Sequence, residues 1–147
     1  MNAGEALLIV CPHCQTTNRV RPDDLRKAPD CGHCHKALFT ARPVALDEAG
    51  FERHLTRNQI PLLVDFWAPW CGPCLQMAPA FEQAAAQLEP QVRLAKVNTE
   101  QAQALGARLQ IRSIPTLGLF VGGRELARQA GAMGAADIVR WTRSQLG

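Results

Sequence analysis

The stretch LLVDFWAPWCGPCLQMAP, from Leu62 to Pro79, decides the fold of this chain. An almost entirely apolar run, Ile60–Trp67, predicts a strand that is covered on both faces of its sheet. A turn follows, and Cys71-Gly72-Pro73-Cys74 then opens a segment with the apolar spacing of a helix. A cysteine pair at a strand-to-helix turn indicates redox chemistry, because the amides and dipole of a helix N-terminus favour a thiolate at the first cysteine.

Downstream of this stretch, strand and helix patterns alternate. Apolar runs predict strands over 92–97 and 116–121, and Gly122-Gly123 predicts a tight turn into a returning strand over 125–129. Helical spacing is found over residues 47–58, 71–88, 99–109 and 135–146. A strand, a helix and a strand of these lengths form a right-handed crossover with parallel strands, whereas the hairpin adds antiparallel pairing. The expected fold class is therefore α/β, with a mixed central sheet flanked by helices.

The segment FWAPWCGPC, residues 66–74, closely resembles the active site of thioredoxins, and the predicted elements over 42–147 resemble the thioredoxin fold in their order. A thiolate must attack a substrate disulfide, so Cys71 is the candidate nucleophile. Cys74, one helical turn further on, is the candidate resolving thiol that releases the reduced substrate. The alternative interpretations of this pair are an inert disulfide and half of a metal site.

Two charged residues lie in predicted strands. Asp65 is the only charged residue between Leu62 and Trp67, and because burial of a carboxylate is costly, its pKa should be raised. Asp65 resembles the aspartate that thioredoxins bury beneath the dithiol, where it would relay a proton for Cys74. Lys96 resembles the lysine that thioredoxins place near this aspartate. The alternatives are a structurally tolerated polar residue at a strand edge for Asp65 and a surface-facing strand lysine for Lys96.

The run from Ser113 to Thr116 resembles the thioredoxin loop whose proline is cis and faces the dithiol. The resemblance implies that Pro115 exposes the backbone of Ile114 for strand-like pairing with an extended substrate segment. It also implies an apolar contact surface around the nucleophile, formed by Trp70, Ile114 and Gly131. Without the resemblance, this run would be interpreted as an ordinary turn.

Two further residues lie next to the dithiol motif. We expect Trp67 to pack beside the site rather than to contact the substrate. Leu75 is a departure from the family pattern, because many thioredoxins carry a basic residue directly after the second cysteine. The departure leaves the preference for partners open but does not affect the redox chemistry.

Residues 1–41 differ in character from the rest and are interpreted as a separate module. Two C-x-x-C pairs are separated by sixteen residues, which fits the spacing of paired zinc knuckles. Four thiolates can then hold one structural Zn²⁺ in a tetrahedron: Cys11, Cys14, Cys31 and Cys34. The segment Thr16–Asp30 has few large apolar residues, so metal binding should provide most of the folding free energy of the module.

Three other interpretations of these four cysteines are open. They could form two disulfides, which is less expected in a chain without an export signal. One of His13, His33 and His35 could replace a cysteine as a ligand. The sequence Cys31-Gly32-His33-Cys34 is also the active-site sequence of disulfide isomerases, but here it does not follow a buried strand that ends in tryptophan.

Composition limits the classes of function. Among 147 residues, 16 Lys and Arg and 13 Asp and Glu are interspersed without a run of five like charges, which argues against a nucleic-acid or membrane surface. No apolar run approaches the roughly 20 residues that span a bilayer. The run Ala6–Val10 is too short for a signal sequence, so we expect a cytoplasmic protein. A Gly-rich phosphate loop is absent, so direct nucleotide binding is not expected.

The two modules together resemble the bacterial thioredoxin 2 type, a thioredoxin domain behind a zinc-binding N-terminal extension. This resemblance implies a cytosolic protein-disulfide reductase that acts on disulfide-containing proteins and is recharged by an NADPH-dependent thioredoxin reductase. We expect a monomer. Two rival functions are open: a zinc-ribbon module that binds protein or nucleic acid on a thioredoxin scaffold, and a zinc-coupled redox sensor or holdase-type chaperone.

Overall fold

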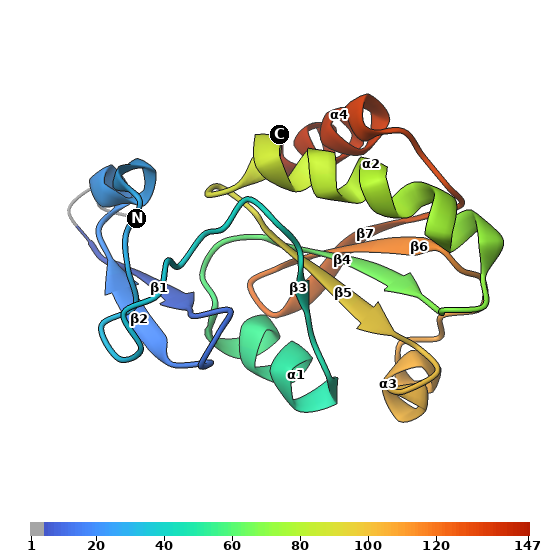
Figure 1. The fold of residues 1–147 in the computed structure, drawn as a ribbon, viewed down its shortest axis with the longest axis horizontal. Coiled ribbons are helices and arrows are strands. Elements are labelled where there is room, and N and C mark those ends of the chain that lie inside the picture. Colours follow the sequence, from blue (N-terminus) through green and yellow to red (C-terminus); the bar gives the residue numbers. More distant parts are fainter. Residues whose placement is uncertain (1–4) are drawn as a thin grey trace.

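The computed structural model describes residues 5–147, in which a small N-terminal module lies beside a larger α/β domain (Figure 1). Its elements are β1 (Leu7–Val10), β2 (Thr17–Val20), the 3₁₀ helix η1 (Pro22–Lys27), β3 (Val44–Ala45), α1 (Glu48–Arg57), β4 (Leu62–Trp67), α2 (Gly72–Leu88), β5 (Arg93–Asn98), α3 (Gln103–Arg108), β6 (Thr116–Val121), β7 (Arg124–Ala130) and α4 (Ala135–Leu146). Among the described residues, no helix is long and apolar enough to cross a membrane.

The central sheet has five strands in the order β3-β5-β4-β6-β7. The central strand β4 runs parallel to β5 and antiparallel to β6, and β7 returns antiparallel to β6 after the predicted Gly122-Gly123 turn. Helices α2 and α4 cover one face of the sheet, and α1 and α3 cover the other (Figure 1). The predicted α/β fold with a mixed sheet is confirmed.

The alternation of side chains along β4 determines the face of the sheet on which Asp65 lies. Leu63 packs into the core beneath α2 and α4, whereas Phe66 packs into the core of the opposite face with α1 and α3. Because side chains two apart in a strand share a face, Asp65 lies on the same face as Leu63, under the helix that begins with the dithiol. Its exposed fraction is 0%.

The boundaries of most elements lie within two residues of those predicted, with α3 as the exception. This helix begins at Gln103 rather than at Thr99, because Asn98 Oδ1 accepts a hydrogen bond from the amide of Glu100 and holds the preceding residues in a turn. The strands β1, β2 and β3 were not predicted. They have four, four and two residues, which is too short for a side-chain period to be recognised.

The N-terminal module is built around β1 and β2, which pair antiparallel. The segment between the knuckles contributes few apolar residues, as expected, but residues outside it complete a small core. That core also takes in Ile60 from the larger domain; its buried members are Leu7, Ile9, Cys11, Val20, Cys31, Leu38 and Ile60. The module therefore has more apolar packing than the segment Thr16–Asp30 alone suggested.

The side chain of Arg93, on β5, attaches the module to the sheet. Its guanidinium is 1% exposed, and its Nη2 donates a hydrogen bond to the carbonyl oxygen of Val10 at 3.0 Å. Its Nη1 lies 3.6 Å from Glu89 Oε2, and its Cζ lies 4.5 Å from the centre of the Phe39 ring. Glu89 Oε1 in turn accepts a hydrogen bond from the amide of Ala41 at 3.0 Å. Both members of this buried ion pair thus hold residues of the module.

A second set of hydrogen bonds joins β1 to the segment after α1. Asn58 Oδ1 accepts from the amide of Val10 at 3.0 Å, and Gln59 Oε1 accepts from the amide of Leu8 at 2.8 Å. The amide of Gln59 donates back to the carbonyl of Leu8 at 2.8 Å. The backbone of β1 is therefore paired with β2 on one edge and with this segment on the other. These contacts were not predicted from the sequence, although Arg93 lies in an apolar run as Asp65 does.

We expect Arg93→Met to destabilise the folded protein by about 3–5 kcal/mol, because it leaves the Glu89 carboxylate buried without its cation. Burial raises the pKa of Glu89 and the charge of Arg93 opposes that shift, so the loss should shrink at acid pH, where Glu89 takes up a proton. Urea unfolding of the wild type and the variant measures this loss. The double variant Arg93→Met/Glu89→Gln should regain part of it; a single variant as stable as the wild type would contradict the assigned role.

Candidate active site and metal centre

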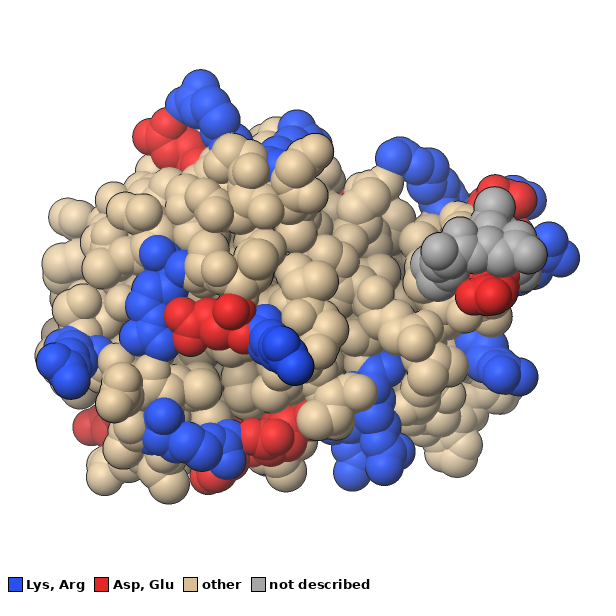
Figure 2. Space-filling view, turned by 180° about the vertical axis from the view of Figure 1, so that it is seen from behind, with Lys and Arg blue, Asp and Glu red and all other residues tan. Residues whose placement is uncertain are grey.

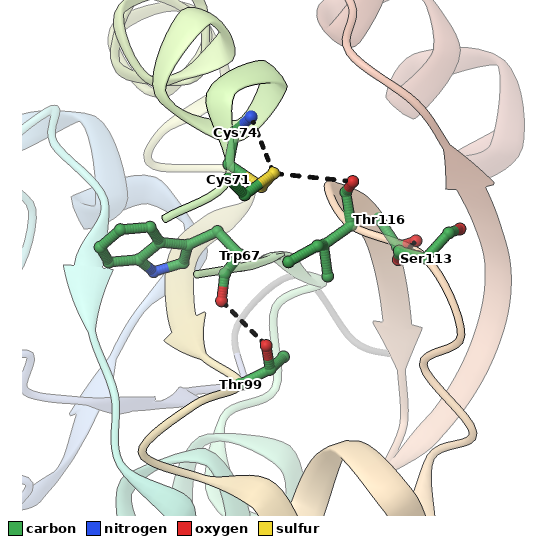
Figure 3. Close-up of a disulfide and its surroundings, with 7 residues drawn as sticks. Trp67, Cys71, Cys74, Thr99, Ser113 and Thr116 are labelled. Carbon is green, nitrogen blue, oxygen red and sulfur yellow. Dashed lines mark hydrogen bonds between the residues drawn. A yellow bond between two sulfur atoms is a disulfide. The ribbon is translucent and has the colours of Figure 1, made fainter. Parts of the chain in front are cut away.

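The dithiol lies where β4 gives way to α2. Cys71 is the N-cap residue of α2 and forms a disulfide with Cys74, with their Cα atoms 5.2 Å apart (Figure 3). The amide of Cys74 donates a hydrogen bond to Cys71 Sγ at 3.2 Å. Cys71 is 5% exposed and Cys74 is 2% exposed. In the reduced protein the same amide and the helix dipole would stabilise a thiolate at Cys71.

The loop before β6 faces this disulfide. The peptide bond between Ile114 and Pro115 is cis, as the resemblance implied. The carbonyl oxygen of Ile114 lies 3.7 Å from Cys71 Sγ. The hydroxyl of Thr116 donates a hydrogen bond to the carbonyl of Ser113 at 2.6 Å and so fixes both ends of the loop.

The structure brings two of the residues predicted to form the contact surface, Ile114 and Gly131, to this loop. Ile114 is half-buried and packs against the disulfide. The amide of exposed Gly131 donates to the carbonyl of Pro115 at 2.9 Å, and Trp70 is 70% exposed. Trp67, the last residue of β4, is half-buried and packs against the cluster that contains the disulfide. These positions are compatible with the predicted roles.

Asp65 is the buried acid of the site. Burial raises its pKa to about 7, as the sequence predicted, while the charge of Lys96 acts in the opposite direction. Lys96 is the register partner of Asp65 on β5, and its Nζ lies 4.5 Å from the centre of the Trp67 ring. Among the described residues, neither carboxylate oxygen of Asp65 has a hydrogen-bond partner. Asp65 lies on the central strand rather than at a sheet edge, and Lys96 is half-buried rather than fully exposed.

Asp65→Asn should stabilise the oxidised protein at pH 7 and lose this advantage at pH 4. The folded protein keeps the Asp65 proton up to a pKa of about 7, whereas an unfolded chain loses it near pH 3.9. Between these values the folded state binds more protons, so the wild type loses stability as pH rises, by up to about 4 kcal/mol. Urea unfolding of both proteins at pH 4, 5.5 and 7 measures this. A stability difference that did not change with pH would contradict the shifted pKa.

Four sulfur atoms converge in the N-terminal module. The Sγ atoms of Cys11, Cys14, Cys31 and Cys34 all lie within 4.8 Å of one another. The pairs Cys11–Cys34 and Cys14–Cys31 are each 3.6 Å apart, and none of these cysteines forms a disulfide. Tetrahedral Zn²⁺ with Zn–S bonds of about 2.3 Å places its sulfur ligands about 3.8 Å apart. The four cysteines are therefore positioned to hold one metal ion.

The two knuckles that carry these sulfurs are built alike. The equivalent residues Gln15 and His35 adopt φ angles of 66° and 65°, and each donates its amide to the carbonyl of the first cysteine of its knuckle. The amides of His13 and His33 donate to the sulfur of that cysteine at 3.3 Å. The ring Nε2 of His13 is instead 3.0 Å from the carbonyl oxygen of Ala37. Within residues 5–147, this candidate metal cluster consists of cysteines alone.

A cleft of about 1010 Å³ separates the first knuckle from the larger domain. Its walls include His13 and Cys14 on one side and Arg53, Trp67 and Lys96 on the other. The disulfide is not among its lining residues. Trp67 lines this cleft and also packs against the disulfide, so it lies between the two.

The surroundings of the disulfide define the class of protein, a thiol–disulfide oxidoreductase with a thioredoxin fold. Comparison with known proteins agrees. The family model described as Thioredoxin matches residues 42–144, and the model described as Thioredoxin 2, N-terminal, a zinc ribbon, matches residues 10–36. The chain therefore belongs to the thioredoxin family, whose members reduce disulfides.

Individual relatives are similar over most of their length. Thioredoxin C-3 from Corynebacterium nephridii is 42% identical over 140 residues, which cover 95% of this chain and 96% of that protein. Thioredoxin 1 from Synechococcus elongatus is 43% identical over 89 residues, which cover 60% of this chain and 83% of that protein. Among solved structures, chloroplastic thioredoxin z has a TM-score of 0.65 and 27% identity, over 71% of this chain and 95% of that chain.

Proposed function

We propose that this chain is a cytosolic protein-disulfide reductase that works by thiol–disulfide exchange at Cys71 and Cys74. The observation that carries the proposal is the place of Cys71 Sγ, which caps α2 beside the amide of Cys74 and faces the carbonyl of Ile114. The four free cysteines of the module also suit a reducing compartment.

The exchange proceeds in two steps. The Cys71 thiolate attacks one sulfur of a substrate disulfide, so that a Cys71–substrate bond forms, the substrate S–S bond breaks and the other substrate sulfur leaves and takes up a proton. Cys74 then loses its proton and attacks the Cys71 sulfur, so that the Cys71–Cys74 disulfide forms, the Cys71–substrate bond breaks, and the second substrate sulfur leaves and takes up a proton. The substrate gains two electrons and two protons. Asp65, with its pKa of about 7, is suited to accept the proton of Cys74.

The partners follow from this chemistry and from the family. Thioredoxins act on disulfide substrates and are reduced by thioredoxin reductase; we assign this chain protein disulfides as substrates and an NADPH-dependent thioredoxin reductase as its reductant. The substrate segment would pair with the backbone of Ile114 beside Pro115 and contact Trp70 and Gly131, and Lys96 would assist Asp65. We propose a monomer and assign it no nucleotide or nucleic-acid partner. On the face in Figure 2, basic and acidic side chains are interspersed, which disfavours the nucleic-acid alternative.

Cys71→Ser should abolish disulfide reduction, whereas Cys74→Ser should accumulate a covalent mixed disulfide with the substrate. The reason is the polarity of the site, with Cys71 at the helix end and Cys74 one turn inside. Insulin reduction measures the first effect, and non-reducing electrophoresis with mass spectrometry measures the second. Trapping by Cys71→Ser together with normal turnover by Cys74→Ser would reverse the assigned roles.

We further propose that residues 1–41 are a module that holds one structural Zn²⁺ through Cys11, Cys14, Cys31 and Cys34, and that residues 42–147 are the catalytic domain. The sulfur separations and the amides that point at Cys11 and Cys31 support this. When bound, the ion would hold four thiolates together and contribute folding free energy, as structural zinc does elsewhere. It would take no part in the exchange reaction.

Removal of the metal should unfold the module and spare the core of the larger domain. Structural zinc contributes roughly 10–16 kcal/mol in finger peptides, which the small apolar cluster of the module cannot replace. Metal analysis under reducing conditions and hydrogen exchange in chelator measure this, with Cys71→Ser as a control that keeps its zinc. Protein without zinc, or a module still folded in chelator, would contradict the proposal.

A chain that lacks residues 1–41 should still reduce insulin, but with lower stability because Arg93 loses its contacts with Val10 and Phe39.

A zinc-coupled redox sensor or holdase-type chaperone is the second candidate function. The observation that favours it is the partial exposure of two of the four sulfur ligands, since Cys14 and Cys34 are half-buried. Two equivalents of peroxide would convert four thiolates to two disulfides and expel the metal. The same metal analysis after peroxide treatment decides the matter, because retained zinc would contradict the sensor and leave the structural site intact.

A further inference from the structure

The cleft between the first knuckle and the larger domain has a surplus of positive charge. Arg53 on α1 and Lys96 on β5 line it, and among the described residues that line it only Asp47 carries a carboxylate. Asp47 Oδ1 accepts a hydrogen bond from the amide of Gly50 at 2.7 Å and so caps α1. A second acid, Glu48, lines only a smaller hollow of about 240 Å³ next to the cleft. The charge of Asp47 is therefore used within α1 itself.

The two cations of the cleft have no carboxylate partner. Within residues 5–147 there are five ion pairs, and neither Arg53 nor Lys96 belongs to any of them. Arg53 is exposed. Lys96 is half-buried, and its Nζ lies over the Trp67 ring, 4.5 Å from the ring centre. Because an aromatic face is a weaker partner for an ammonium group than a carboxylate is, both cations are available to an anion that enters the cleft.

The size and the walls of the cleft suit an extended peptide better than a small anion. Its volume of about 1010 Å³ is at the upper end of the roughly 300–1,000 Å³ of pockets that enclose small ligands. One wall contains the end of β3 and the two residues after it, and β3 is an edge strand of the central sheet. Strand edges take extended segments as partners. In such a segment every second side chain points the same way, so acids at alternate positions would face the cations together.

We propose that this cleft is a docking site for an extended acidic segment of a partner protein, whose carboxylates bind Arg53 and Lys96. The proposal does not rest on the proposed reductase function, because the disulfide does not line the cleft and Trp67 lies between the two. Both parts of the chain form the site, since His13 and Cys14 of the first knuckle face α1 across it. A thioredoxin domain without the module would lack one of its walls.

The test is the binding of a labelled peptide of about six residues that has glutamate at every second position and no cysteine. A control peptide has glutamine in place of each glutamate. Fluorescence anisotropy with the full-length protein at low ionic strength gives the Kd of each. Exposed charge contacts contribute about three- to fivefold each, so the glutamate peptide should bind roughly tenfold more tightly. Added salt should reduce this difference, because it screens exposed charges.

Two exposed arginines provide matched variants. Arg53→Gln should weaken binding of the glutamate peptide about three- to fivefold, and Arg53→Lys should keep most of the affinity because the charge stays. Arg124 is also exposed and outside the five ion pairs, but it lies on β7, at the opposite edge of the sheet. Arg124→Gln should therefore bind as the wild type does. The double variant Arg53→Gln/Lys96→Gln should bind the two peptides alike, and urea unfolding checks that each variant is folded.

The indole NMR signals of the tryptophans locate the bound peptide. Trp67 lines the cleft and Trp70 does not. The glutamate peptide should therefore shift the indole signal of Trp67 and leave that of Trp70 unchanged. A peptide that shifted only Trp70 would bind beside the dithiol and would overturn the proposal. So would equal affinities of the two peptides, or of the wild type and Arg53→Gln.

Other occupants of the cleft are outcomes of the same experiments. Inorganic phosphate that bound as tightly as the glutamate peptide would indicate a site for small anions. A single-stranded oligonucleotide that bound more tightly than the peptide would indicate a nucleic-acid site. A dimer in sedimentation that Arg53→Gln dissociates would mean that the cleft receives a second copy of this chain. Each of these three results would overturn the proposal.

Discussion

One buried guanidinium contacts both parts of this chain and joins them. Arg93 reaches from the central sheet to the carbonyl of Val10, the residue before the first zinc-ligand candidate, and lies against the Phe39 ring. Removal of an arginine and a glutamate from water is costly, and burial accordingly lowers the pKa of Arg93 and raises that of Glu89. The hydrogen bonds to Val10 and Ala41 and the contact with the Phe39 ring offset part of this cost.

The parts of the fold that could be predicted are those encoded locally. The continuous apolar run of β4, the cysteine pair at its end and the Gly122-Gly123 turn each fix a short stretch of chain, and together they give the sheet and its mixed strand directions. The attachment of the module could not be predicted in this way. It depends on hydrogen bonds between residues 48 to 83 positions apart, which leave no periodic signal in the sequence.

The features of the candidate site also divide into those that the sequence pattern predicted and those that it did not. A carboxylate in an apolar strand predicted the burial and the raised pKa of Asp65, and the spacing of four cysteines predicted that their sulfurs would meet. The cis bond at Pro115 came only from the family resemblance. The position of Lys96 over Trp67 and the exposure of Leu75 depend on which way a side chain turns, which the sequence pattern leaves undetermined.

The short length of β3 has a consequence for the role of the N-terminal module. β3 has two residues and pairs only with Ala95 and Lys96, so it covers a small part of the outer edge of β5. The module is attached to the beginning of this strand, at Arg93. The opposite edge, β7, carries charged side chains, a common protection against pairing with other chains. Loss of the module would uncover Ile60 and Arg93, so that apolar surface beside a weakly covered edge would face neighbouring molecules and favour aggregation.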